Sequence, residues 1–183
     1  MKGKRKNMKA LVLTDYEWGI AKKGRLPFHL KGDLKRFKEA TTGGTVVMGR
    51  KTLESLPNGK PLPNRTNIVL TRDKNYKVDG VIVVNSIEEL KKELLNHEDD
   101  STYLIGGEAV YKELLHECSD VIVTWVHKTV GCDQFFPNLF NMEKDWIEWG
   151  AEVGDPLYDE VEDVHYEYII FCNRKFYNEE ELL

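Results

Sequence analysis

Residues 45–52 read TVVMGRKT, and this stretch gives the first indication of the fold. Its first four residues are β-branched or apolar, as in a buried strand, and the strand ends at Gly49. Two cations and a threonine follow, where a helix is expected to begin. Backbone N–H groups are free at the start of a helix, so this turn suits an anion such as phosphate. Taken alone, the stretch fits a solvated basic turn equally well.

The same order of strand and then helix recurs on both sides of this stretch. Helices are expected at Lys31–Ala40, after the capping box Ser86-x-x-Glu89, and at Gly107–Leu115. This alternation predicts parallel strands, whereas the last strands lack helices between them and predict an antiparallel edge. We therefore predict an α/β fold: a single domain with a mixed, mostly parallel, eight-stranded twisted sheet, about four helices on its two faces and an antiparallel C-terminal edge. The eight strand-like runs are Lys9–Thr14, Thr45–Met48, Asn67–Thr71, Val81–Val84, Thr102–Ile105, Asp120–His127, Trp146–Val153 and Val164–Cys172.

Length and composition describe one ordinary globular domain. The 183 residues suit a single domain, and 41% hydrophobic with 31% charged residues is usual for such proteins. We expect a disordered basic extension over residues 1–7, the domain over 8–175 and an acidic tail over 176–183. The net charge of −5 argues against nucleic acid as a partner. No run approaches the roughly 20 apolar residues of a membrane span.

The cysteines and histidines indicate a reducing compartment and no metal. Cys118, Cys132 and Cys172 are odd in number, far apart and without a C-x-x-C pair, which fits free thiols. The five histidines show no ligand spacing such as H-E-x-x-H. The expectation is a cytoplasmic, monomeric protein without a metal site.

An acid lies beside an apolar stripe in the stretch LPFHLKGDLKRF, residues 26–37. At about 100° per residue, Asp33 lies about 40° from Phe37 and about 60° from Leu30 on a helix. Spacing alone favours an ordinary first-turn aspartate, stabilised by the helix dipole by ~0.3–1 kcal/mol. The alternative is a carboxylate buried in a cleft, where it binds a flat, amidine-like ligand edge through two hydrogen bonds.

Further polar signals follow other strands. Gly106 and Gly107 separate a strand from a helix and allow a close approach of the backbone to a pyrophosphate, although a structural turn is as good an interpretation. Arg72 follows a strand, and Arg65 follows Pro-Leu-Pro-Asn; each is a candidate anion ligand or a surface arginine. Together the signals describe one cleft for a phosphorylated dinucleotide beside a ligand with a polar ring and an anionic tail.

The order and spacing of these motifs resemble those of the dihydrofolate reductases. The motifs are LPF-x4-DL-x2-FK, VMGRKT, PLP-x-R-x-NIVLT, IGG-x2-VY and CD-x-FFP, and they extend from about Met8 to Lys175. The resemblance implies that NADPH reduces 7,8-dihydrofolate to tetrahydrofolate by hydride transfer from nicotinamide C4 to pterin C6. Water protonates N5 with the help of Asp33. It also implies a role in one-carbon metabolism and in thymidylate, purine and glycine synthesis, and binding of antifolate inhibitors.

The resemblance also implies a role for individual residues of the substrate site. Asp33 matches the acid that binds the pterin edge, and Thr124 matches the threonine that hydrogen-bonds this acid. Arg65 matches the arginine that binds the glutamate α-carboxylate. The implied catalytic residues are Asp33, Leu26 and Thr124. The implied substrate contacts are Leu11, Val12, Asp33, Leu34, Phe37, Leu56, Leu62, Arg65, Ile105, Tyr111 and Thr124.

The implied cofactor contacts surround the glycine pair, which a cis peptide joins in the family. The segment Asp15–Leu26 matches a mobile loop that closes over the nicotinamide. In that loop Ala21 replaces a usual glycine, and Phe28 after it replaces a usual tryptophan, which puts loop kinetics and turnover in doubt. The implied cofactor contacts are Leu13, Ile20, Gly49, Arg50, Lys51, Thr52, Leu70, Thr71, Arg72, Ile105, Gly106, Gly107, Glu108, Ala109, Val110 and Tyr111.

Two other functions stay open at this point. One is a reductase of the same fold that acts on a pyrimidine intermediate of riboflavin synthesis. Its substrate carries a ribityl phosphate and no glutamate tail, so the use of Arg65 separates it from a dihydrofolate reductase. The other is a non-enzymatic module that binds folate or a nucleotide, because Asp33 serves binding as well as catalysis.

Overall fold

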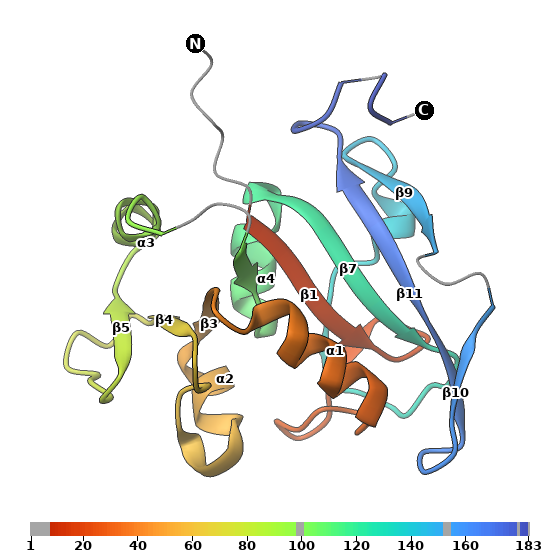
Figure 1. The fold of residues 1–183 in the computed structure, drawn as a ribbon, viewed down its shortest axis with the longest axis horizontal. Coiled ribbons are helices and arrows are strands. Elements are labelled where there is room, and N and C mark those ends of the chain that lie inside the picture. Colours follow the sequence, from red (N-terminus) through yellow and green to blue (C-terminus); the bar gives the residue numbers. More distant parts are fainter. Residues whose placement is uncertain (1–7, 98–100, 152–154, 179, 183) are drawn as a thin grey trace.

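The computed structural model describes residues 8–97, 101–151, 155–178 and 180–182. A large twisted sheet forms the centre of the molecule, and its continuous path runs β10-β11-β7-β1-β6-β3-β4-β5, while β9 pairs with β11 beside this path (Figure 1). The bounds of these strands are β1 Met8–Thr14, β3 Thr45–Gly49, β4 Thr66–Leu70, β5 Val81–Val84, β6 Thr102–Leu104, β7 Cys118–Val126, β9 Trp146–Ala151, β10 Leu157–Asp159 and β11 Val164–Asn173. A separate small sheet joins β2 Gly19–Ala21 to β8 Gln134–Phe135.

The pairing of the strands divides the sheet into a parallel part and an antiparallel edge. Strands β7, β1, β6, β3, β4 and β5 pair in parallel along the path. Strand β11 runs antiparallel to β7, β9 and β10. The predicted mixed, mostly parallel sheet with an antiparallel C-terminal edge is therefore confirmed.

Helices cover both faces of the sheet, because apolar side chains alternate between the two faces along each strand. On β3, Val47 joins the core cluster that contains Leu90 and Leu114, whereas Val46 joins the cluster that contains Leu53. One face therefore carries α3 and α4, and the other carries α2. Helix α1 crosses the sheet in front of β1 (Figure 1). The bounds are α1 Lys31–Thr41, α2 Arg50–Ser55, α3 Ile87–Leu94 and α4 Glu108–Leu114, with short 3-10 turns at Pro57–Gly59, Leu115–Glu117 and Leu139–Asn141.

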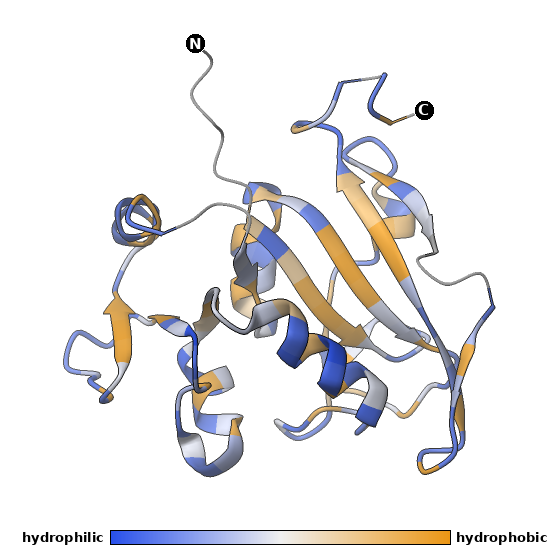
Figure 2. Ribbon diagram, viewed as in Figure 1, coloured by the Kyte–Doolittle hydropathy of each residue, from blue (hydrophilic) through white to orange (hydrophobic). Residues whose placement is uncertain are grey.

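Helix α1 is the least covered of these helices. Its buried residue is Thr41, and the side chain of Leu34 is 38% exposed. Figure 2 shows hydrophobic residues concentrated in β1, β7 and β11, while α1 is largely hydrophilic. The helix therefore leaves part of its apolar stripe accessible beside the sheet.

Each of the eight predicted strand runs contains a strand, and the structure adds short strands that were not predicted. Strand β10 joins the main sheet, and β2 and β8 form the small one. The end of the predicted run at Val153 and the predicted extension over residues 1–7 lie outside the described residues. Beyond the predicted domain end at Lys175, the hydroxyl of Tyr177 donates a hydrogen bond of 2.6 Å to Asp120. In the described part of the chain, no helix has the length and apolar character to cross a membrane.

Candidate functional site

The glycine pair lies where two neighbouring parallel strands end. The amide of Gly49 at the end of β3 donates to the carbonyl of Gly106, with an N···O distance of 2.8 Å. The peptide bond between Gly106 and Gly107 is cis, as the resemblance implied. Gly106 has φ of 128°, a conformation that side chains rarely adopt, and a Cβ on Gly107 would lie 3.2 Å from the hydroxyl of Thr52. Backbone without a side chain therefore lies between β3, α2 and α4, with Gly106 buried and Gly107 partly accessible.

Helix α4 is fixed to the sheet behind this pair. Tyr111 is 3% exposed, and its hydroxyl donates to the carbonyl of Leu11 on β1 over 2.6 Å. Val110 is buried, and a Cβ on Gly49 would lie 2.9 Å from its side chain. This contact shows why a glycine stands at the end of β3: the helix packs directly against the backbone there.

The predicted acid and the predicted threonine meet between α1 and the sheet. The hydroxyl of Thr124 on β7 donates to Oδ1 of Asp33 over 2.5 Å. Thr124 pairs with Leu13 in the register of β7 and β1, so the acid lies over the carboxyl end of β1. Burial raises the pKa of the Asp33 carboxyl, while the bond from Thr124 and the charge of Arg36 oppose this rise.

Apolar side chains lie on the same face of the sheet as the acid. Leu56, Leu62 and Ile105 pack against the cluster around Met48 on the α2 face of the sheet. Across from them, α1 presents Leu34 and Phe37, neither of which is buried. The Asp33 carboxyl and these apolar side chains thus share the sheet face that carries α1 and α2, and we call this region the slot.

Arg65 lies at the end of α1 and already has partners there. Its Nε donates to the hydroxyl of Thr41 over 2.7 Å, and a terminal nitrogen donates to the carbonyl of Pro63 over 2.7 Å. Its guanidinium is partly buried, and this burial lowers its pKa. These bonds orient the guanidinium at the rim of the slot.

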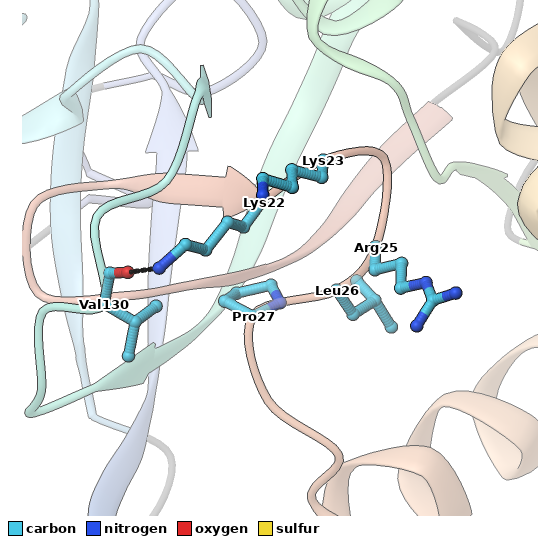
Figure 3. A pocket seen from close by; sticks show the side chains of 6 residues that line it. All are labelled: Lys22, Lys23, Arg25, Leu26, Pro27 and Val130. Carbon is cyan, nitrogen blue, oxygen red and sulfur yellow. Dashed lines mark hydrogen bonds between the residues drawn. The ribbon is translucent and has the colours of Figure 1, made fainter.

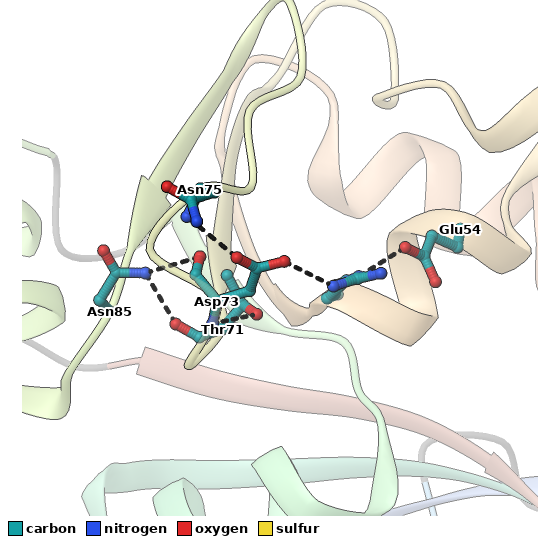
Figure 4. A network of polar contacts seen from close by, with 6 residues as sticks. Glu54, Thr71, Asp73, Asn75 and Asn85 are labelled. Carbon is teal, nitrogen blue, oxygen red and sulfur yellow. Dashed lines mark hydrogen bonds and ion pairs between the residues drawn. The ribbon is translucent and has the colours of Figure 1, made fainter.

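Arg50, at the start of α2, is held by two carboxylates. Its Nε lies 2.7 Å from Glu54 and its NH1 lies 2.9 Å from Asp73, and its guanidinium also stacks on Tyr76. Asp73 belongs to a polar network that follows β4 (Figure 4). The other two predicted cations, Lys51 and Arg72, are exposed. Glu108, also among the predicted cofactor contacts, pairs with Lys112 at 2.8 Å.

The segment that follows β1 is hydrogen-bonded to the segment that precedes β8. The Lys23 amide donates to the carboxylate of Asp133 over 2.7 Å, and the Asp133 amide donates to the carbonyl of Ala21 over 2.9 Å. The fully buried carboxylate of Asp15 accepts from the amides of Gly19 and Val130 over 2.7 and 3.2 Å. Neither Asp15 nor Asp133 was among the predicted site residues, because their role depends on a contact more than a hundred residues along the chain.

A basic pocket of about 560 Å³ opens on the outer side of this segment (Figure 3). Leu26, a predicted catalytic residue, is 55% exposed and lines the pocket with Pro27. Lys22 also lines it, with its ammonium group 2.7 Å from the carbonyl of Val130. The pocket shows that the predicted loop stands open to solvent around Leu26.

Comparison with known proteins assigns the class and the family. A solved structure of dihydrofolate reductase from Enterococcus faecalis, complexed with NADP(H) and RAB-propyl, is similar with a TM-score of 0.81 and 34% identity over 93% of this chain and 98% of that one. The fold and the site are those of an oxidoreductase. The sequence profile of the dihydrofolate reductase family matches residues 7–172, and the chain belongs to this family. The family predicted from the motifs is thus confirmed.

Curated relatives agree. A dihydrofolate reductase of Staphylococcus aureus is 42% identical over 127 residues, which are 69% of this chain and 76% of that protein. A bifunctional dihydrofolate reductase-thymidylate synthase of Paramecium tetraurelia is 44% identical over 126 residues, which are 67% of this chain and 27% of that protein.

Proposed function

We propose that the chain uses NADPH to reduce 7,8-dihydrofolate to 5,6,7,8-tetrahydrofolate. The observation that carries this proposal is the bond between Thr124 and Asp33, which holds a single carboxyl in an apolar slot. The acid lies over the carboxyl end of β1, and the glycine pair lies at the carboxyl ends of the parallel strands β3 and β6. An acid, apolar side chains and bare backbone at the carboxyl ends of parallel strands suit a flat ring with a polar side beside a phosphorylated cofactor.

Each part of the substrate has a candidate partner in the slot. The carboxylate of Asp33 accepts two hydrogen bonds from the N3 and 2-amino edge of the pterin. Leu34 and Phe37 contact the benzoyl ring from one side, and the leucines of the opposite wall contact it from the other. Arg65, oriented by its bond to Thr41, binds the glutamate α-carboxylate. A reductase for a pyrimidine without that tail has no use for this arginine.

The residues at the glycine pair suit a dinucleotide that carries phosphates. Gly106 and Gly107 permit close backbone approach, and Thr52 offers a hydroxyl beside them. Arg50, Lys51 and Arg72 supply positive charge. NADPH, when bound, supplies the hydride from nicotinamide C4 to pterin C6.

Asp33 assists the protonation of N5 without touching it. A carboxylate that binds the N3 edge faces away from N5, so a water molecule delivers the proton and the negative charge of Asp33 favours the protonated ring. Thr124 holds the carboxylate in place, and Leu26 excludes bulk water as the loop closes. The product serves one-carbon metabolism and the synthesis of thymidylate, purines and glycine. We further propose that the protein is a monomer and lies in the cytoplasm, whose reducing conditions suit three free cysteines.

The test follows the loss of NADPH absorbance in two reactions. The substrate is dihydrofolate in the first, and a dihydropterin that lacks the benzoylglutamate tail in the second. We expect oxidation of NADPH with both compounds, and a much higher KM for the one without the tail. The same assay with a ribitylated pyrimidine should show no turnover. Binding of dihydrofolate with no turnover would reject the enzyme and leave a binding module.

A further inference from the structure

Arg36 lies one helical turn after Asp33 on α1, so the two side chains lie on the same face of the helix. The carbon Cζ of its guanidinium lies 3.8 Å from the ring centroid of Tyr168 on β11. This is a close cation–π contact between the helix and the sheet. Thr41 is the buried residue of α1, and the contact of Arg36 with Tyr168 links the helix to the sheet close to Asp33.

The ring of Tyr168 is connected to the acid by a second route. Tyr168 pairs with Thr124 in the register of β11 and β7, and Thr124 donates to Asp33. Tyr166, two residues earlier, packs edge-on against Tyr168 with ring centroids 5.8 Å apart. Asp33 and Arg36 on α1 therefore both contact the sheet: Asp33 contacts Thr124 on β7, and Arg36 contacts Tyr168 on the neighbouring strand β11.

The charges around the acid identify the group that stabilises its ionised form. Thr124 on β7 and Arg36 on α1 act on the Asp33 carboxyl, which in turn acts on Tyr166 and Tyr168 on β11. Burial raises the pKa of both tyrosines, so they are neutral in the range where a carboxyl titrates. Burial also raises the pKa of Asp33, and the positive charge of Arg36 acts against it.

We propose that Arg36 is a positioning residue that, stacked on Tyr168, keeps Asp33 ionised and held by Thr124 before the substrate arrives. The inference rests on the proposed role of Asp33 in binding the pterin. A guanidinium is planar and stays charged, so it stacks on a ring and still faces the carboxylate. The ammonium group of a lysine is compact and more strongly hydrated, so it is held less well against the ring.

The test follows the titration of the Asp33 carboxyl by NMR in protein labelled with 13C at the aspartate carboxyl carbons, without substrate or cofactor. The signal is assigned by its loss in Asp33→Asn. In Arg36→Met we expect the midpoint of the titration to rise by about one pH unit. In Arg36→Lys we expect a smaller rise, because the charge stays and the stacking is lost.

Lys35→Met is the matched control, since it removes a cation next to Arg36. The Lys35 side chain is 77% exposed and pairs with Glu39 at 3.9 Å, so we expect no change in the titration of Asp33. Three outcomes overturn the proposal: an unchanged midpoint in folded Arg36→Met, an equal shift in Lys35→Met, or no shift at all in Arg36→Lys. The titration of Arg36→Lys tests the proposal even if Arg36→Met fails to fold. The titration needs no turnover, so it is independent of the absorbance assay that tests the proposed function.

Discussion

Replacement of Asp33 by asparagine removes the charge of the site and keeps its shape. The carboxylate is partly buried beside Thr124, and an amide oxygen accepts the same hydrogen bond. A negative charge at about 4 Å from the positive charge of a protonated ring, with an effective dielectric constant of about 20, stabilises that ring by ~4 kcal/mol. Since ~1.36 kcal/mol corresponds to a factor of ten in rate, we expect hydride transfer to slow about a thousandfold.

The assay is a single-turnover measurement near neutral pH, with NADPH and dihydrofolate both at saturation, so that binding and product release do not contribute. Thr124→Ser is the control, because it keeps the hydroxyl that holds the acid. A folded Asp33→Asn protein with a rate within tenfold of the unmodified protein would refute the electrostatic role assigned to Asp33.

The same substitution has a consequence for stability that depends on pH. Burial raises the pKa of Asp33 above 3.8, so the folded state binds this proton more tightly than the unfolded state. The free energy of unfolding of the unmodified protein therefore falls as pH rises from about 3.8 through the raised pKa. The asparagine of Asp33→Asn does not bind this proton, so we expect the stability of the variant relative to the unmodified protein to increase over that pH range. Urea unfolding at several pH values measures the difference, and a constant difference would contradict the assignment.

Three further perturbations test other parts of the structure. The cations around Arg50 predict a higher kcat/KM with NADPH than with NADH, and equal values would contradict a phosphate site there. Asp73 and Arg50 form an exposed ion pair, so Asp73→Asn frees the guanidinium from one of its two carboxylates and should lower the Kd for NADPH while leaving that for NADH unchanged, as measured by calorimetry. In Gly44→Ala the new Cβ would lie 2.3 Å from the carbonyl oxygen of Ser101, so urea unfolding should show a loss of ~1–3 kcal/mol; an unchanged midpoint would mean that the two backbones separate without cost.

Much of the fold was predictable because its signals are local. The Ser86 side chain accepts from the amide of Glu89, as the capping box predicted, and α3 begins directly after Ser86. Apolar runs of four or more residues marked the main strands, and the region without helices marked the antiparallel edge. Helix α1 covers Lys31–Thr41, one residue longer than predicted. Such patterns depend on residues that are close in sequence.

The parts that were not predicted depend on distant partners. Strands β2, β8 and β10 contain two or three residues each, too few for a periodic pattern, and they form because a partner strand lies beside them. The spacing of Asp33 on its helix favoured an ordinary first-turn aspartate. Its contact with Thr124, 91 residues along the chain, was implied by the resemblance and not by any local pattern. The stacking of Arg36 on Tyr168 joins residues more than a hundred positions apart, and no local sequence motif predicts it.

The position of β11 in the sheet has a consequence for the order in which the chain folds. This strand pairs with β7, β9 and β10, and all three precede it in the chain. During synthesis, β7 therefore emerges with one edge unpaired, and it stays so until Val164–Asn173 has left the ribosome. An unpaired edge can pair with other chains, so we expect β7 to be prone to intermolecular pairing until β11 covers it. We also expect completion of the sheet, and with it the stacking of Arg36 on Tyr168, to come late in folding.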